Sequence, residues 1–253
     1  MDIRFDEKGI LISGAAGHLG RQLVKDYCSS GAKTLVLLDT QEHKNDLLKL
    51  KEEYSANAKV YVYTADFRNV EEIVQVVENI EKKGIIIDVL INNAGINILK
   101  KPGELTEDVW DYILDVNLKG SFFLTKEVGR MSLINRKGNV IFISSQHGVV
   151  GNTMRSAYCS SKTGILGLMR ALTADWSVFG VRVNAVSPTF IINEANEGFL
   201  MNPREKRNML NKIPLHKYAT VFDISNAVLF LSSEKAGMIT GHNLVVDGGY
   251  TCV

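Results

Sequence analysis

The sequence has little cysteine, little proline and almost no net charge. Its 253 residues include three cysteines and four prolines, and 29 basic against 28 acidic side chains leave a formal charge of +1. The scattered thiols of Cys28, Cys159 and Cys252 cannot build a disulfide framework, so a reducing, cytoplasmic setting is expected. Because the charges balance and no long basic run occurs, we expect no nucleic-acid partner.

Long apolar runs are missing as well. The best stretch, residues 84–91, is interrupted by Asp88 and falls far short of the roughly 20 residues that span a membrane. The polar N-terminus does not resemble a secretory signal, so no membrane association is expected. The histidines and cysteines lack metal-ligand spacing, and no metal site is predicted. With 45% hydrophobic residues the chain is too apolar for disorder, and residues 1–253 are expected to form a single domain.

Short apolar segments alternate with longer amphipathic ones. The short segments are rich in β-branched and aromatic residues, which predicts strands over Gly9–Ile12, Thr34–Leu38, Val60–Tyr63, Val89–Ile91, Val140–Ile143, Val181–Val183 and Leu244–Val246. Helices are expected over Arg21–Ser30, Val70–Lys82, Glu107–Ile134, Ala157–Phe179 and Val221–Ser233. Such alternation is typical of βαβ units. The predicted fold is α/β, a doubly wound, Rossmann-type parallel sheet of about seven strands, although the alternation alone also fits a barrel.

A glycine-rich turn follows the first predicted strand. Gly14, Gly17 and Gly20 precede a helix, where glycines permit a tight turn and let a pyrophosphate approach backbone N–H groups. Asp39 closes the next strand 19 residues after Gly20. A carboxylate there can accept both ribose hydroxyls of an adenosine and repels a 2′-phosphate, and no Arg or Lys follows it directly, so the predicted cofactor is NAD rather than NADP. The alternative for Asp39 is a simple turn cap.

A second set of residues predicts acid–base chemistry. Tyr158 and Lys162 stand four residues apart in a predicted helix and therefore share one face. A neighbouring ammonium stabilises a phenolate and lowers the pKa of the phenol, which suits Tyr158 for proton transfer near neutral pH. Ser145 follows the strand Val140–Ile143, at the edge of the sheet where such folds bind ligands. The spacing of Tyr158 and Lys162 alone is weak, but its combination with the glycine turn is specific.

These motifs together resemble the short-chain dehydrogenase/reductase family in its single-domain form. The resemblance spans nearly the whole chain and comprises the glycine turn, Asp39, Asp66, Asn92–Gly95, Asn117, Ser145, Tyr158, Lys162, Asn184–Pro188, Thr240–Gly241 and Asp247–Gly249.

The resemblance implies a role for each matching residue. Tyr158 would exchange a proton with the substrate oxygen, Ser145 would hydrogen-bond that oxygen, and Lys162 would lower the pKa of Tyr158 and hold the nicotinamide ribose. Asn117 would anchor a water leading from Lys162 to solvent, with a structural core amide as the alternative. The implied cofactor contacts are Gly14, Gly17, His18, Leu19, Gly20, Asp39, Asp66, Phe67, Asn93, Ala94, Gly95, Tyr158, Lys162 and Ile191.

Three positions depart from the family pattern. His18 replaces the middle glycine of the turn, a spacing similar to that of sugar-nucleotide epimerases, which keeps an epimerase or dehydratase as an alternative function. Thr189 replaces the glycine that usually follows Pro188. Asn193 replaces a threonine that commonly contacts the nicotinamide carboxamide, a contact that asparagine can also make.

We expect loop residues to determine which substrate binds. Residues 190–207 are expected to form a lid, and Gln146, Arg155, Ser145 and Tyr158 are the candidate substrate contacts. Arg155 suits a carboxylate or phosphate, with a solvated loop arginine as the alternative. Residues 144–146, 158–162 and 184–189 resemble sugar-handling reductases of the xylulose/dicarbonyl type, so we expect a polyol or sugar-like small molecule. The tail, residues 239–249, also resembles 3-oxoacyl reductases.

The leading hypothesis is therefore an NAD-dependent oxidoreductase that interconverts a secondary alcohol and a ketone. A 3-oxoacyl-thioester reductase, a sugar-nucleotide epimerase and a non-catalytic NAD-sensing protein are the alternatives. The long helical segments Glu107–Ile134 and Ala157–Phe179 carry apolar residues over much of their surface, which predicts a homotetramer or homodimer.

Overall fold

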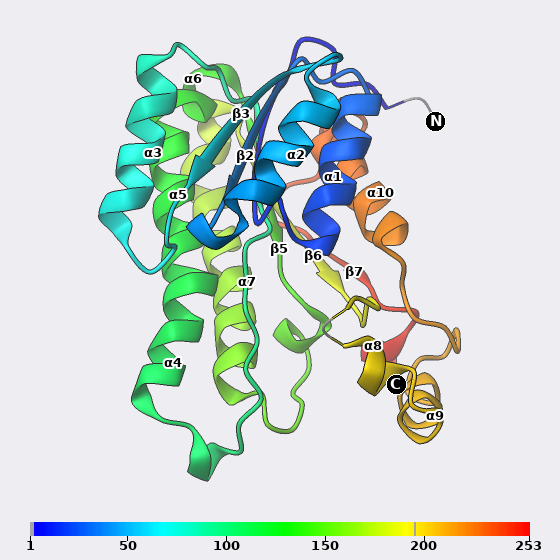
Figure 1. Cartoon of the computed structure of the whole chain (residues 1–253). Coiled ribbons are helices and arrows are strands. Elements are labelled where there is room, and N and C mark those ends of the chain that lie inside the picture. The colour runs from blue at the N-terminus through cyan, green and yellow to red at the C-terminus, as the bar shows by residue number, and fades with distance from the viewer. Residues whose placement is uncertain (1–2, 195) are drawn as a thin grey trace.

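One parallel sheet organises the protein (Figure 1). The computed structural model describes residues 3–194 and 196–253. Seven strands lie in the order β3-β2-β1-β4-β5-β6-β7. Their bounds are β1 Gly9–Ser13, β2 Thr34–Asp39, β3 Lys59–Thr64, β4 Val89–Asn92, β5 Asn139–Ile143, β6 Arg182–Pro188 and β7 Asn243–Val246. Each predicted strand is confirmed, and β6 continues beyond its predicted end to Pro188.

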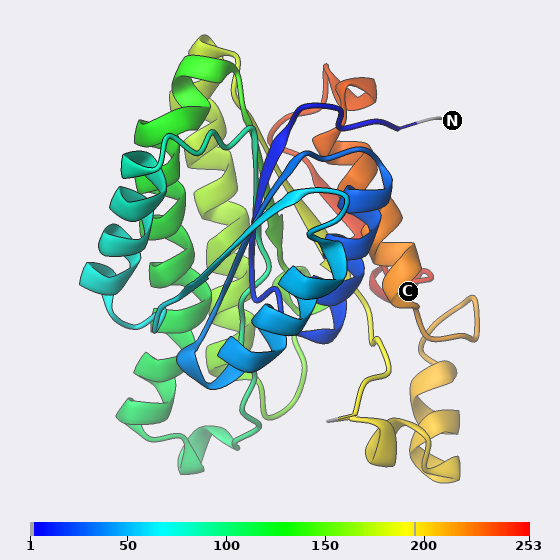
Figure 2. The same ribbon diagram turned by 45° about the horizontal axis from the view of Figure 1, so that its top comes forward.

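Helices cover both faces of the sheet (Figures 1 and 2). On one face lie α1 (His18–Ser29), α2 (Lys44–Tyr54) and α10 (Val221–Ser232). On the other lie α3 (Val70–Lys82), α4 (Glu107–Leu114), α5 (Ser121–Val128), α6 (Ile134–Arg136) and α7 (Ser156–Trp176). Helix α2 was not predicted, because only Leu47 and Leu50 of this charged segment are buried. None of the described helices is long and apolar enough to cross a membrane.

The strands separate two apolar cores. Ile10 and Ile12 of β1 pack in the core on the α1 side, whereas Leu11 between them packs in the core on the α3 side. Because successive side chains of a strand point to opposite faces, a strand with helices on both sides is apolar throughout. This explains why the strands lack the alternation of apolar and polar residues that a half-exposed strand shows.

The predicted helix Glu107–Ile134 is interrupted twice by π-helical turns. The first turn covers Asp115–Gly120 and the second Gly129–Leu133. Insertions of this kind are frequent at functional sites because they rotate the side chains that follow them. Asn117 lies in the first of them.

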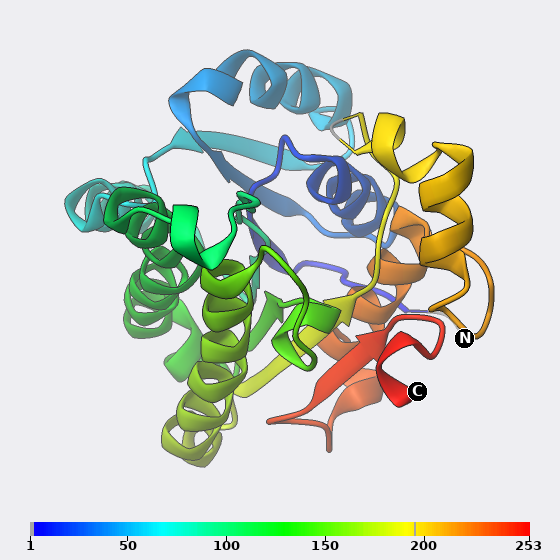
Figure 3. The same cartoon turned by 90° about the horizontal axis from the view of Figure 1, so that it is seen from below.

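The chain order places a crevice at the carboxyl edge of the sheet. From β1 the chain builds outward through β2 and β3, then returns to pair β4 with the other side of β1. Ligands of such folds bind at the carboxyl ends of strands beside this reversal. The predicted lid contains α8 (Glu197–Leu200) and the start of α9 (Pro203–Leu210). Seen from below, these helices lie on one side of that edge and α7 on the other (Figure 3).

Candidate active site

The glycine turn packs so tightly that two of its glycines admit no side chain. Gly14 has a φ of +63°, and a Cβ atom there would lie 2.9 Å from the Cα of Ala94. A Cβ atom at Gly20 would lie 2.1 Å from the carbonyl oxygen of Gly14. Helix α1 therefore starts close beneath the turn and directs its N-terminal N–H groups, which favour anions, towards the crevice.

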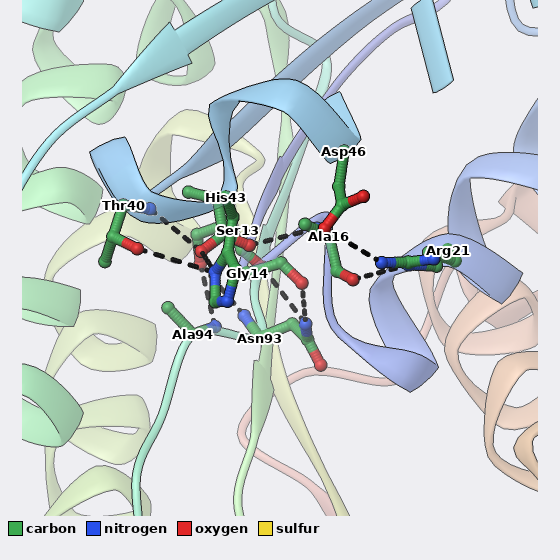
Figure 4. A network of polar contacts seen from close by, with 10 residues as sticks. Ser13, Gly14, Ala16, Arg21, Thr40, His43, Asp46, Asn93 and Ala94 are labelled. Carbon is green, nitrogen blue, oxygen red and sulfur yellow. Dashed lines mark hydrogen bonds and ion pairs between the residues drawn. The ribbon is translucent and has the colours of Figure 1, made fainter. Parts of the chain in front are cut away.

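Ser13 and Asn93 join the glycine turn to the end of β4 (Figure 4). The Ser13 hydroxyl accepts hydrogen bonds from the backbone N–H groups of Asn93 and Ala94, at 3.0 and 3.1 Å. The Asn93 amide donates to the carbonyl oxygens of Ser13 and Gly14, at 3.1 and 2.9 Å. The sequence analysis did not identify Ser13 as part of the site. Its position, at the last residue of a strand before a glycine turn, was the available signal.

Asp39 ends β2 beside the same turn. Its carboxylate accepts hydrogen bonds from the backbone N–H groups of Ala16 and Thr40, at 2.9 and 2.8 Å. His43 Nδ1 lies 2.8 Å from the same carboxylate. Asp39 thus holds the glycine turn through Ala16, in addition to capping the turn that follows β2 through Thr40.

A cavity of about 780 Å³ opens at this edge. Most of the predicted cofactor contacts line it: Gly14, Gly17, His18, Leu19, Asp39, Asp66, Phe67, Asn93, Ala94, Gly95 and Ile191. Gly20, Tyr158 and Lys162 are not among the lining residues, and Gly20 instead lies buried beneath the turn. Asn193 also lines the cavity. The volume and the close backbone approach at the turn fit an extended dinucleotide.

Arg68, which no sequence motif marks, is a cation of the cavity wall. Its guanidinium makes a bidentate ion pair with the carboxylate of Asp66 and lies 5.0 Å from the ring centre of Tyr112. The hydrogen bonds from Arg68 hold the pKa of Asp66 below its ordinary value. The predicted adenine contact Asp66 is therefore already paired, and Arg68 is not a free cation.

Ser145, Tyr158 and Lys162 come together where β5 meets α7. Ser145 follows β5, and its hydroxyl accepts a hydrogen bond of 3.1 Å from the backbone N–H of His147. Lys162 is buried, and its ammonium donates a hydrogen bond of 2.8 Å to the carbonyl oxygen of Ile143. The Lys162 nitrogen lies 5.9 Å from the ring centre of Tyr158. The structure thus brings together the three residues that the sequence predicted for acid–base chemistry.

Burial dominates the titration of this group. It raises the pKa of Tyr158, and a hydrogen bond with Ser145 and the charge of Arg155 oppose that effect in part. Burial also lowers the pKa of Lys162 to about 8. The net direction for Tyr158 is opposite to the one that its pairing with Lys162 predicts, because desolvation of the phenolate outweighs the attraction of nearby positive charge.

Asn117 links the end of β4 to α7. Its side chain accepts a hydrogen bond of 2.8 Å from the N–H of Ile96 and donates one of 2.9 Å to the carbonyl oxygen of that residue. It donates another of 3.0 Å to the hydroxyl of Ser161, next to Lys162. A Cβ atom at Gly95 would lie 3.2 Å from the Lys162 nitrogen and 3.3 Å from the Asn117 oxygen. The side chains of Asn117 and Lys162 therefore both approach the backbone of Gly95.

Three aromatic rings meet beside the loop that follows β5. His147, Phe190 and Tyr250 lie edge to face, with ring centres 5.9 to 6.2 Å apart. They come from the loop after β5, the predicted lid and the C-terminal turn. Burial and the charge of Arg155 lower the pKa of His147 to about 4. Phe190 is the first residue of the predicted lid, whereas Tyr250 was not predicted, because no local pattern joins residues so far apart.

The two other predicted substrate residues lie near this cluster. Gln146 is buried, and its side-chain oxygen has no hydrogen-bond partner within residues 3–194 and 196–253. Arg155 immediately precedes α7, and its charge acts on the pKa of Tyr158, His147 and Tyr250. Arg155 is therefore within electrostatic range of the groups that surround Ser145.

Comparison with known proteins identifies the family. Residues 14–251 match the family model described as Enoyl-(Acyl carrier protein) reductase. The chain is 32% identical to an NAD-dependent glycerol dehydrogenase of Listeria innocua, over 99% of this chain and 96% of the relative. It is 33% identical to a D-threitol dehydrogenase of Mycolicibacterium smegmatis, over 99% and 95%. A 3-oxoacyl-[acyl-carrier-protein] reductase of Thermotoga maritima is 32% identical, over 98% and 99%.

A solved structure supports the same family. A putative short-chain alcohol dehydrogenase from Sinorhizobium meliloti is 28% identical and superposes with a TM-score of 0.92, over 100% of this chain and 99% of that one. The chain belongs to the short-chain dehydrogenase/reductase family. Its members are oxidoreductases that use a nicotinamide cofactor, which is consistent with the cavity beside the glycine turn.

Proposed function

We propose that the protein interconverts a secondary alcohol and a ketone of a small polyol or sugar-like substrate, with NAD as its cofactor. The observation that carries the proposal is the grouping of Ser145, Tyr158 and Lys162 at the carboxyl edge, next to the cavity that Asp39 lines. A bound nicotinamide would accept the hydride in oxidation or supply it in reduction.

The side chains divide the remaining chemistry between them. In oxidation, the Tyr158 phenolate takes the hydroxyl proton of the substrate, and in reduction the phenol returns it to the carbonyl oxygen. Ser145 holds that oxygen. Lys162 and Asn117, which both approach Gly95, hold the nicotinamide ribose and pass the proton on towards solvent. Gln146 and Arg155 contact the rest of the substrate, and Arg155 suits an anionic group on it.

The preference for NAD is proposed from the charges around the adenosine end. Asp39 presents a carboxylate there, which repels a 2′-phosphate. The two arginines nearby are engaged, since Arg21 binds the carbonyl of Ala16 and the carboxylate of Asp46, and Arg68 binds Asp66. A 2′-phosphate would therefore compete with the carboxylates that these two arginines already bind.

Absorbance at the NADH band tests this proposal. Glycerol, threitol, a small hydroxy acid and a 3-hydroxyacyl thioester are each supplied with NAD and with NADP. We expect a polyol to be turned over with NAD, with kcat/KM at least about tenfold higher than with NADP. Turnover confined to the thioester would instead support the 3-oxoacyl reductase, the second candidate, which the relative from Thermotoga maritima favours. Cofactor binding without any turnover would favour an NAD sensor.

We also propose that copies of the chain assemble into a homotetramer. The α4–α7 side leaves large apolar side chains at the surface, among them Trp110 and Phe179, which are 38% and 48% exposed. Burial of such side chains between copies would stabilise an assembly. Light scattering after gel filtration measures the mass directly, and a monomer would contradict this proposal.

A further inference from the structure

The carboxylate of Asp39 already accepts several hydrogen bonds within the protein. One oxygen accepts the N–H of Ala16, and the other accepts the N–H of Thr40 and lies 2.8 Å from His43 Nδ1. A carboxylate offers about four lone-pair positions for hydrogen bonds. Three of them are occupied, by Ala16, Thr40 and His43. The adenosine ribose of NAD presents two hydroxyls, so Asp39 alone has one acceptor position too few for both.

The tautomer of His43 follows from its partner. A carboxylate only accepts hydrogen bonds, so His43 Nδ1 must carry the proton that points at Asp39. In the neutral ring, Nε2 is then an acceptor. The side chain of His43 is 52% exposed, and the residue lines the same cavity as Asp39. Within the described residues, 3–194 and 196–253, no hydrogen bond engages Nε2.

The position of His43 is set by a short, well-anchored turn. A 3₁₀ turn, Gln41–His43, follows Thr40, and the N–H of His43 donates to the carbonyl oxygen of Thr40 at 3.1 Å. Gln41 accepts a hydrogen bond of 2.9 Å from the hydroxyl of Thr64 at the end of β3. The imidazole is therefore held beside Asp39 before any ligand binds.

We propose that Asp39 and His43 together bind the adenosine ribose of the cofactor, Asp39 accepting one hydroxyl and His43 Nε2 accepting the other. His43 then supplies the hydrogen-bond acceptor that Asp39 lacks for the second hydroxyl. This inference rests on the proposed function, because it requires a bound adenine dinucleotide. It adds a residue that lies outside the predicted cofactor contacts.

Calorimetry with ADP, 2′-deoxy-ADP and 3′-deoxy-ADP tests the inference without any substrate. In His43→Ala we expect the Kd for ADP to rise about tenfold, the usual cost of one lost hydrogen bond. The analogue that lacks the hydroxyl bound by His43 should bind wild type and variant with Kd values within about twofold of each other. The other analogue should keep the tenfold difference. His43→Asn, whose amide can both donate to Asp39 and accept from ribose, should recover most of the affinity.

His242→Ala removes an exposed histidine before β7 and serves as the matched control, with no expected change in any Kd. Two results would overturn the inference: an unchanged or lower Kd for ADP in His43→Ala, or an equal loss for all three nucleotides, which would mean that His43 only positions Asp39. If the wild type bound neither ADP nor NAD, the cofactor proposal itself would fail. Binding without turnover of any alcohol would leave the ribose inference intact and contradict only the proposed catalysis.

Discussion

Two ends of the carboxyl edge differ in what their polar side chains contact. At the end that we propose binds the cofactor, Ser13, Asn93 and Asp39 each make several hydrogen bonds to the backbone of neighbouring turns. At the end that we propose binds the substrate, the side-chain oxygens of Gln146 and Thr189 are buried and lack a hydrogen-bond partner among the described residues, as does that of Asn92 at the end of β4. Unpaired buried polar groups cost stability unless a ligand or water pairs with them.

The contrast matches the demands of the two ligands. The pyrophosphate of a nicotinamide dinucleotide is common to NAD and NADP, so its site can be built from backbone groups that are fixed in advance. A substrate differs from member to member, and its contacts come from side chains on loops carried by that rigid frame. The cofactor end should therefore respond to substitution mainly through stability and nucleotide affinity, and the substrate end through turnover and pH dependence.

The largest effect is expected at Tyr158. Tyr158→Phe removes the proton donor and acceptor but keeps the ring, so kcat should fall by about 10³-fold or more while NAD still binds with its original affinity. Steady-state absorbance and calorimetry measure the two quantities. Tyr61→Phe on β3 is the matched control and should leave both unchanged. Loss of NAD binding together with turnover would place Tyr158 in the cofactor end of the site.

His147 should make the substrate end sensitive to acid. Its pKa is about 4 in the folded protein, against about 6.5 in an unfolded chain. The unfolded state therefore takes up the proton first, and the stability that the neutral, buried ring provides is complete above pH 6.5 and lost as the pH falls towards 4. Lowering the pH from 7.5 to 5 should cost about 2 kcal/mol through this residue.

Urea unfolding at the two pH values, with His147→Asn and the exposed control His242→Asn, isolates that contribution. The His147 variant should lose less stability on acidification than the wild type, whereas the control should lose the same amount as the wild type. Parallel losses in all three proteins would mean that His147 titrates normally.

Ser13→Ala probes the cofactor end. The variant leaves the N–H groups of Asn93 and Ala94 without the hydroxyl that accepts their hydrogen bonds, and we expect a loss of about 1–3 kcal/mol in the free energy of unfolding. The affinity for NAD should fall as well, because the turn and the end of β4 are no longer joined. Urea unfolding and calorimetry measure these changes, with Ser55→Ala at the exposed end of α2 as the control. A stable variant with normal affinity would show that the remaining Asn93 contacts suffice.

The smallest effect is expected from Arg155. Its positive charge lowers the pKa of Tyr158, so Arg155→Ala should raise that pKa and shift the pH profile of alcohol oxidation upward by up to about one unit. Oxidation needs the phenolate, so the rate at neutral pH should fall by up to about tenfold. Arg155→Lys keeps the charge and should keep the profile. If the midpoint of the pH profile is unchanged in Arg155→Ala, the charge of Arg155 does not influence the titration of Tyr158.

Much of the fold could be predicted because the signals were local. The inner strands β1, β2, β4 and β5 are buried along nearly their whole length, and short apolar segments of this kind are visible in the sequence. Helix α2 was missed because two buried leucines are too few to reveal a periodic face. The π-helical turns Asp115–Gly120 and Gly129–Leu133 were not predicted, because a continuous apolar segment looks the same with or without an inserted residue.

The sequence by itself determined the family and the parallel α/β sheet, because glycine turns, strand ends and helix spacing are local properties of the chain. It also predicted Ser145, Tyr158 and Lys162 as the catalytic group, which stays a prediction. Only the tertiary structure decided which groups face one another. It placed His43 on the carboxylate of Asp39, paired Arg68 with Asp66 and brought His147, Phe190 and Tyr250 together. It also reversed the expected direction of the pKa of Tyr158, since the cost of burying a charge depends on everything packed around it.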